Sequence, residues 1–209
     1  MLQKMNWGVT GLVAGLVLMG GLSGCTVRVD KDASGKEKNV QVETPFGSVH
    51  VNSDQTTASD VGLPVYPGAA LVKDDDKNKS ADVQAGFGRW QVRVRVVSYS
   101  TSDSKEKVTA FYKKALSRYG DVITCQGNSP VGTPTMTAQG LTCTEDKNAK
   151  VQIDRKDYGS SKDGLTLKAG SKRHQHIVGF DDPKDGKTRF ALVALELPSE
   201  TGNSKEKSD

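Results

Sequence analysis

The stretch from Phe87 to Ser100, "FGRWQVRVRVVSYS", constrains the fold more than any other part of this chain. Within it Trp90, Val92 and Val94 are each followed by a polar or basic residue. Successive side chains on a strand point to opposite faces, so this alternation predicts a β-strand with one apolar face. A strand needs neighbours to be stable, so the remaining chain must supply a sheet.

Several further segments have the composition of strands. A β-hairpin is expected at residues 39–52, where Val40 and Val42 face Val49 and Val51 across the turn "TPFG". After the middle of the chain, strands are expected at the segments 122–125, 141–144, 151–155, 165–169, 174–180 and 189–197. Turns rich in Gly, Asp, Lys and Pro separate these segments.

One amphipathic helix is predicted, from Asp103 to Tyr119. Its apolar residues recur at helical spacing and share one face: Val108, Phe111, Tyr112, Ala115, Leu116 and Tyr119. Asp103 and Glu106 have the spacing of a capping box, and Gly120 suits the position after the helix. We therefore expect an α+β fold, an antiparallel β-sheet with one amphipathic helix packed across it, plus an N-terminal β-hairpin.

The first residues of the chain resemble an export signal. Lys4 precedes an uncharged run from Met5 to Val27. This run contains many glycines, and small residues stand directly before Cys25. Glycine is unfavourable inside a helix, so this run suits a removed signal better than a membrane-spanning helix. An uncleaved anchor helix is the alternative.

The four residues Leu22-Ser23-Gly24-Cys25 match the lipobox of bacterial lipoproteins. In that family the Cys thiol is alkylated by a diacylglyceryl group and the signal is cut before the cysteine, so the resemblance implies that Cys25 carries the lipid. It further implies an exported protein of the cell envelope, anchored to a membrane. Thr26 follows the cysteine rather than Asp, which resembles sorting to the outer membrane.

A second resemblance covers residues 63–197. The pattern "LPVYPGA" followed by "VTAFYKKALSRYG" is similar to uncharacterised bacterial envelope lipoproteins with an α+β domain. The expected organisation is a signal peptide at 1–24, a lipidated tether at 25–38, the hairpin at 39–52, a linker at 53–62, the α+β domain at 63–198 and a disordered tail at 199–209. This resemblance implies no catalytic residue.

Two cysteines remain once Cys25 is assigned to the lipid. An exported compartment and an even count favour a disulfide between Cys125 and Cys143, with two buried thiols as the alternative. His174 and His176 lie at strand spacing and are weak candidates for a metal site, and the acidic stretches at 74–78 and 181–186 leave weak calcium binding as a further alternative to solvated turns. A zinc site needs three or four ligands, so an exposed strand face is the preferred interpretation, and no metal or cofactor is expected.

The sequence predicts no catalytic residue. It contains neither G-x-S-x-G nor H-E-x-x-H. The net charge is +4 with acidic and basic residues interspersed, which argues against a nucleic-acid-binding surface. We therefore expect a lipid-anchored binding or scaffolding module that is not an enzyme, whose hairpin docks on an envelope protein by strand addition. The alternative is a metal-dependent or hydrolytic envelope enzyme that uses His174 and His176.

Overall fold

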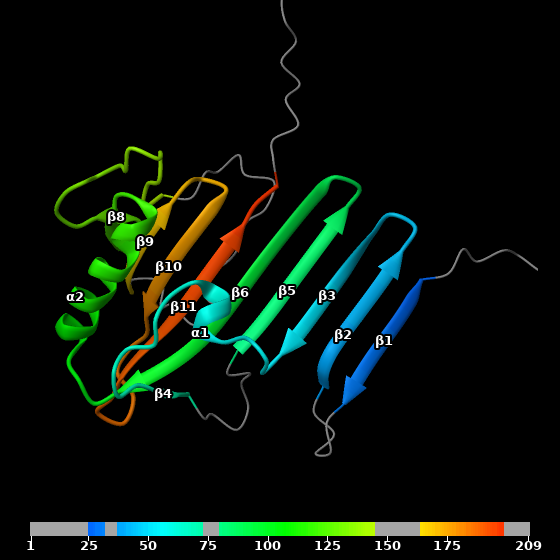
Figure 1. Ribbon diagram of the computed structural model, residues 1–209, viewed down its shortest axis with the longest axis horizontal. Coiled ribbons are helices and arrows are strands. Elements are labelled where there is room, and N and C mark those ends of the chain that lie inside the picture. Colours follow the sequence, from blue (N-terminus) through cyan, green and yellow to red (C-terminus); the bar gives the residue numbers. More distant parts are fainter. Residues whose placement is uncertain (1–24, 32–36, 73–79, 145–163, 199–209) are drawn as a thin grey trace, which may run out of the picture.

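The computed structural model describes residues 25–31, 37–72, 80–144 and 164–198. These residues form one antiparallel sheet of 11 strands (Figure 1). Along the sheet the strand order is β1-β2-β3-β5-β6-β11-β10-β9-β7-β8, and the short β4 also pairs with β6. The strands are β1 (Thr26–Lys31), β2 (Glu37–Thr44), β3 (Gly47–Ser53), β4 (Ala70–Leu71), β5 (Ser80–Phe87), β6 (Trp90–Thr101), β7 (Ile123–Gln126), β8 (Ser129–Pro130), β9 (Leu165–Gly170), β10 (His174–Phe180) and β11 (Thr188–Glu196).

Two α-helices lie on one face of this sheet. They are α1 (Ala58–Val61) and α2 (Lys105–Leu116), and a single 3-10 turn, η1 (Ser117–Tyr119), continues α2. In Figure 1 both helices lie over the half of the sheet that contains β6, β11, β10 and β9, and no helix lies over β1, β2 or β3. We call the side that carries the helices the helix face.

The expected α+β class is wrong. Only 13% of the described residues are helical, in two short helices, and they form mostly one large antiparallel sheet. The amphipathic helix does form, but α2 spans only part of the sheet. The sequence prediction does not include strands β1, β5 and β8, and it leaves open whether the hairpin joins the main sheet.

The hairpin of β2 and β3 lies within the sheet rather than beside it. Asn39 to Thr44 pairs with Gly47 to Asn52, as the alternating valines indicate. In addition β2 pairs with β1, and β3 pairs with β5. Both strands are therefore paired on both sides. The segment 25–38 includes strand β1, and the segment 53–62 includes helix α1, whose Ala58 and Val61 are buried.

The main core lies between the helices and the sheet. Alternate residues of β6, β9, β10 and β11 point to the helix face and meet the apolar side of α2. The largest fully buried side chains of this core are Tyr112, Phe180, Phe190, Leu116, Leu167 and Leu192. Burying side chains of this size contributes about 1.5–3 kcal/mol each relative to exposure, so this layer is the principal source of stability.

The start of α2 differs from the sequence prediction. The residue before the helix is Ser104, and it makes no side-chain capping bond. Asp103 instead accepts a hydrogen bond of 2.9 Å from the hydroxyl of Tyr66 and one of 3.1 Å from Lys107. The predicted capping box is therefore wrong, because a tertiary contact with Tyr66 engages the Asp103 carboxylate.

Helix α1 is short but well capped. The backbone N–H of Thr57 donates to the Asp60 carboxylate at 2.8 Å, and the Asp60 N–H donates back to the Thr57 hydroxyl. Gly62 ends the helix with φ of 77°. A Cβ at Gly62 would lie 2.6 Å from the hydroxyl oxygen of Tyr119, so glycine is required there for both conformation and space.

The other predicted strands have different outcomes. Strands β7, β9, β10 and β11 occupy four of the segments expected from the sequence. Residues 141–144 form no strand. The segment 151–155 lies outside the described residues.

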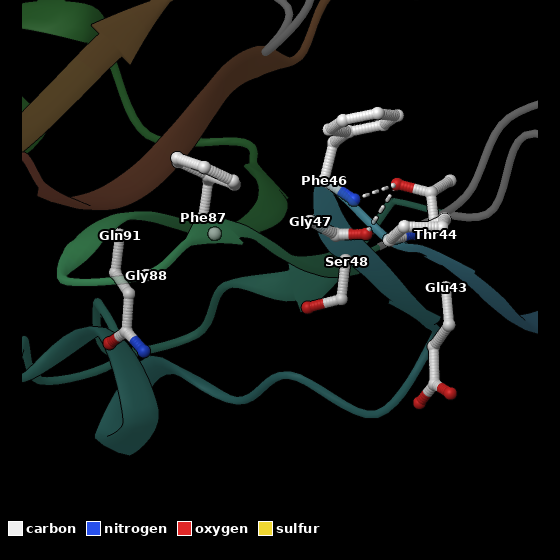
Figure 2. Close-up of a pocket in the computed structure, with 10 residues that line it drawn as sticks. Glu43, Thr44, Phe46, Gly47, Ser48, Phe87, Gly88 and Gln91 are labelled. Carbon is white, nitrogen blue, oxygen red and sulfur yellow. Dashed lines mark hydrogen bonds between the residues drawn. The ribbon is translucent and has the colours of Figure 1, made fainter.

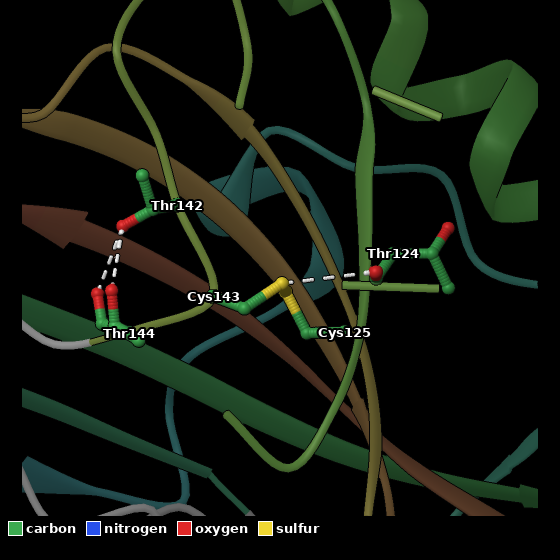
Figure 3. Close-up of a disulfide and its surroundings, with 5 residues drawn as sticks. All are labelled: Thr124, Cys125, Thr142, Cys143 and Thr144. Carbon is green, nitrogen blue, oxygen red and sulfur yellow. Dashed lines mark hydrogen bonds between the residues drawn. A yellow bond between two sulfur atoms is a disulfide. The ribbon is translucent and has the colours of Figure 1, made fainter. Parts of the chain in front are cut away.

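Cys125 and Cys143 form a disulfide, as the sequence predicts (Figure 3). Their Cα atoms are 5.5 Å apart, and the bond closes a loop with a sequence separation of 18. Cys125 lies on β7 and Cys143 on the loop that returns beside it, and both are buried with Ile123 and Leu141. The disulfide therefore joins the loop that follows β8 to strand β7, near the edge of the sheet opposite β1.

Removing this disulfide should lower the free energy of unfolding. Closing a loop of this length constrains the unfolded chain by about 3 kcal/mol in the chain-entropy model. We expect the double variant Cys125→Ala/Cys143→Ala to lose stability of that order in urea denaturation. The matched control is Met136→Ala, which alters an exposed residue of the loop that the disulfide closes. Equal stability of the double variant and the control would contradict the prediction.

Candidate functional site

An apolar face runs across five strands on the side of the sheet opposite the helices. Cross-strand pairing aligns Val29, Val40, Val51, Val83 and Val94 in one row across β1, β2, β3, β5 and β6. A second row contains Val27, Val42, Val49, Ala85 and Val92. We call these two rows the apolar face. Because strand side chains alternate, both rows point away from the helix face.

The helix face of the same strands is polar. Between the two valine rows, the register aligns Arg28, Gln41, His50, Gln84 and Arg93. The Arg93 guanidinium makes two hydrogen bonds with the Asp82 carboxylate, at 2.9 and 2.6 Å. This half of the sheet is therefore amphipathic, with its apolar side opposite to the side that the helices cover.

The apolar face is least exposed on β6 and most exposed on β1. Val92 on β6 is only 7% exposed, whereas Val49 on β3 and Val29 on β1 are both 40% exposed, and Val27 is 61% exposed. All six residues of β1 are exposed. Among the described residues, β1 is the last strand on this side of the sheet. The apolar face is thus most open at the edge that begins directly after Cys25.

Two exposed phenylalanines lie at the end of the sheet where β1 begins. Phe46, in the turn between β2 and β3, is 78% exposed, and Phe87, at the end of β5, is 60% exposed. Figure 2 shows both rings on one side of the sheet, while Glu43, Ser48 and Gln91 point to the other. A hollow of about 410 Å³ lies among these residues.

Glycines allow the β2–β3 turn and the β5–β6 turn to lie close together. A Cβ at Gly47 would lie 2.5 Å from the carbonyl oxygen of Gly86, so the two backbones approach too closely for any side chain there. The Thr44 hydroxyl donates to the Gly47 carbonyl at 2.9 Å and accepts from the Phe46 N–H at 3.2 Å (Figure 2). These contacts order the turn that carries Phe46 and place it beside the end of β5, which carries Phe87.

His176 is half-buried and serves the fold. Its Nδ1 lies 2.9 Å from the carbonyl oxygen of Val61, and a carbonyl can only accept, so Nδ1 carries the proton. Its ring stacks on Tyr119 with centroids 3.6 Å apart, and the Tyr119 hydroxyl donates to the Gly62 carbonyl. His176 and Tyr119 therefore satisfy the carbonyls at the end of α1.

His174 does not join His176 in a site. Both side chains point to the helix face, but His174 is the first residue of β10 and is exposed. A hollow of about 290 Å³ beside them also contains Arg95, which donates to the Asp60 carbonyl and the Glu196 carboxylate. In the part of the chain that the structure describes, no three His, Cys, Asp or Glu residues are grouped to hold a metal.

Sequence reasoning missed the features that distinguish this surface. It recognised the valines of the hairpin but not their alignment with Val29, Val83 and Val94. It gave no role to Phe46 or Phe87. The available signal was the pair of large apolar residues beside turn glycines, where polar residues are usual.

The pKa of His176 lies below its ordinary value of 6.5, chiefly because burial disfavours the charged imidazolium. The charges of Arg118 and Arg95 act in the same direction, whereas the Val61 carbonyl and Glu196 oppose it. The unfolded chain thus binds a proton more readily than the folded chain. Stability from this group is complete above the unfolded pKa and is lost as the pH falls below it.

Acidification should therefore destabilise the protein in part through His176. We expect the free energy of unfolding to fall between about pH 7.5 and about pH 5.5, and to fall less in His176→Phe, which keeps an aromatic ring but cannot take up a proton. Urea denaturation at each pH measures this. The control His174→Phe alters an exposed residue of the same strand. An identical pH dependence in His176→Phe and the unmodified protein would refute the prediction.

No helix among the described residues is long and apolar enough to cross a membrane. Comparisons with family models, with curated proteins and with solved structures found no match for this chain.

Proposed function

We propose that this protein is a lipid-anchored protein of the bacterial cell envelope that acts as a binding module. The lipobox at residues 22–25 supports the anchor, and the exposure of Cys25 is compatible with its modification. Export to an oxidising compartment accords with the disulfide between Cys125 and Cys143. Outer-membrane sorting, suggested by Thr26, belongs to the same proposal.

The observation that carries the binding role is the open edge at β1. Its side chains are all exposed, and in the described part of the sheet no strand pairs with its outer side. The opposite edge is β8, which has only two residues and ends at Pro130, a residue without an N–H. An exposed edge with free backbone groups can receive a strand from another chain.

The chemistry of β1 indicates what kind of segment would bind. Val27 and Val29 continue the apolar face, while Arg28 and Asp30 lie on the polar side. An added strand that alternates apolar and polar residues would extend both faces. The partner is therefore an envelope protein with an exposed extended segment of this pattern. The hairpin cannot play this part, because its strands are already paired on both sides.

The anchor is tested by Cys25→Ser. Without the thiol no diacylglyceryl group can be attached, so the variant should keep its signal segment and lose the acyl mass. Intact mass of protein extracted from membranes reports signal removal and acylation together. Signal removal and membrane partitioning that are unchanged in Cys25→Ser would refute the proposed anchor.

The strand-addition role is tested by comparing Val29→Lys with Val49→Lys. Both valines are 40% exposed on the apolar face, but Val29 lies on the edge strand and Val49 lies inside the sheet. A lysine on an edge opposes strand pairing. A photo-crosslinker placed at Arg28 should capture a partner in envelope membranes, with capture lost in Val29→Lys and retained in Val49→Lys. Equal capture by all three forms would contradict binding at this edge.

A further inference from the structure

The strand register gathers three points of the chain at one end of the sheet. Thr26 pairs with Glu43, the turn from Thr44 to Gly47 follows at once, and Ser48 pairs with Gly86 beside Phe87. The start of β1 therefore lies at the same end as the β2–β3 and β5–β6 turns (Figure 1). Strands are about 4.8 Å apart, so the β5–β6 turn lies about 15 Å from Thr26. We call this end the anchor end.

Among β1, β2, β3, β5 and the turns that join them, the most exposed apolar side chains lie at the anchor end. Phe46, Phe87 and Val27 are each at least 60% exposed, whereas other residues of the apolar face are 40% exposed or less. Exposing two phenylalanine rings to water is unfavourable relative to burying them. Because Gly47 lies against the backbone of Gly86, the β2–β3 turn is adjacent to the end of β5. Both rings therefore belong to one exposed patch.

We propose that the anchor end rests on the lipid bilayer and places Phe46 and Phe87 at the boundary between headgroups and acyl chains. This inference rests on the proposed lipidation of Cys25. Strand β1 begins at the residue after Cys25, so a lipid there holds the anchor end at the membrane surface. Aromatic side chains favour the membrane interface, and a second contact strengthens an anchor that acyl chains alone provide.

The electrostatics of the anchor end suit a lipid surface. Arg89 is exposed in the turn beside Phe87, where its positive charge can meet anionic headgroups. The acidic Glu43 points to the side opposite the two rings (Figure 2). The apolar side of this end is therefore free of the carboxylate that would oppose insertion.

Trp90 provides a native probe of this contact. The chain contains two tryptophans, Trp7 and Trp90, and Trp7 lies in the signal segment that processing removes. Trp90 pairs directly with Phe87 and is half-buried at the anchor end. Its fluorescence in the mature protein therefore reports on this end alone.

The experiment uses lipidated protein extracted from membranes and reconstituted in phosphatidylethanolamine and phosphatidylglycerol vesicles, with bromine on acyl carbons near the headgroup. We expect bromine to quench Trp90. In Phe46→Ser/Phe87→Ser most of this quenching should be lost, whereas Phe46→Leu/Phe87→Leu should keep it. The matched control, Val131→Ser/Met136→Ser, alters exposed apolar residues near the opposite edge and should quench like the unmodified protein.

Each outcome has a distinct meaning. Equal quenching of the serine and leucine variants, or no quenching of acylated protein, would overturn the bilayer contact and leave the lipid anchor intact. Intact mass without acyl chains would overturn the anchor, and this inference with it. A blue shift of Trp90 that depends on protein concentration without vesicles would show contact with a second copy and would also overturn the proposal.

Discussion

The pairing of β6 on both of its sides holds the structure together. This strand pairs with β11 from Arg93 to Thr101 and with β5 from Trp90 to Val97. Its alternate residues serve different purposes: Val97 and Tyr99 enter the core beneath the helices, while Val92 and Val94 belong to the apolar face. A shift of one residue in this register would exchange the two sets and place Arg93 and Arg95 on the apolar face.

The two halves of the sheet are stabilised differently. On the side of β9, β10 and β11, the helix face is closed by α1 and α2, and the disulfide secures the outer loop. On the side of β1, β2 and β3, the helix face is polar, and the apolar valines lie on the other side. The second half therefore depends on its backbone ladder and on pairing with β5. Local opening of this half is expected to begin at β1, which pairs only with β2 among the described strands.

The sequence predicted the elements whose signal is local. The alternation from Trp90 to Val96 specifies β6, and the helical spacing of Val108, Tyr112 and Leu116 specifies α2. The disulfide followed from the cysteine count and the expected compartment. Strand β5, "SADVQAGF", has one large aliphatic residue, Val83, and gives no such signal. It is a strand because β3 and β6 lie on either side of it, which is information from distant parts of the chain.

The candidate site was harder to predict for the same reason. The spacing of His174 and His176 correctly places both on one face, but the partner of His176 is a carbonyl 115 residues earlier in the sequence. The valine rows arise only when five strands adopt their register. Strand β1 carries a visible alternation at Val27 and Val29, yet its position between the lipobox and a charged segment favoured a tether. Expectations about compartment thus obscured a local signal.

With the proposed lipid on Cys25, the position of β1 would limit how far from the membrane this protein can act. The strand begins at Thr26, directly after the residue proposed to carry the lipid. No residue would separate the lipid-bearing Cys25 from strand β1, unlike in proteins whose lipid is joined to the fold by a long flexible linker. The dimensions of the folded sheet would then set the height of the proposed binding edge above the bilayer. Only molecules that come to the membrane surface, or are themselves embedded in it, would be within reach of that edge.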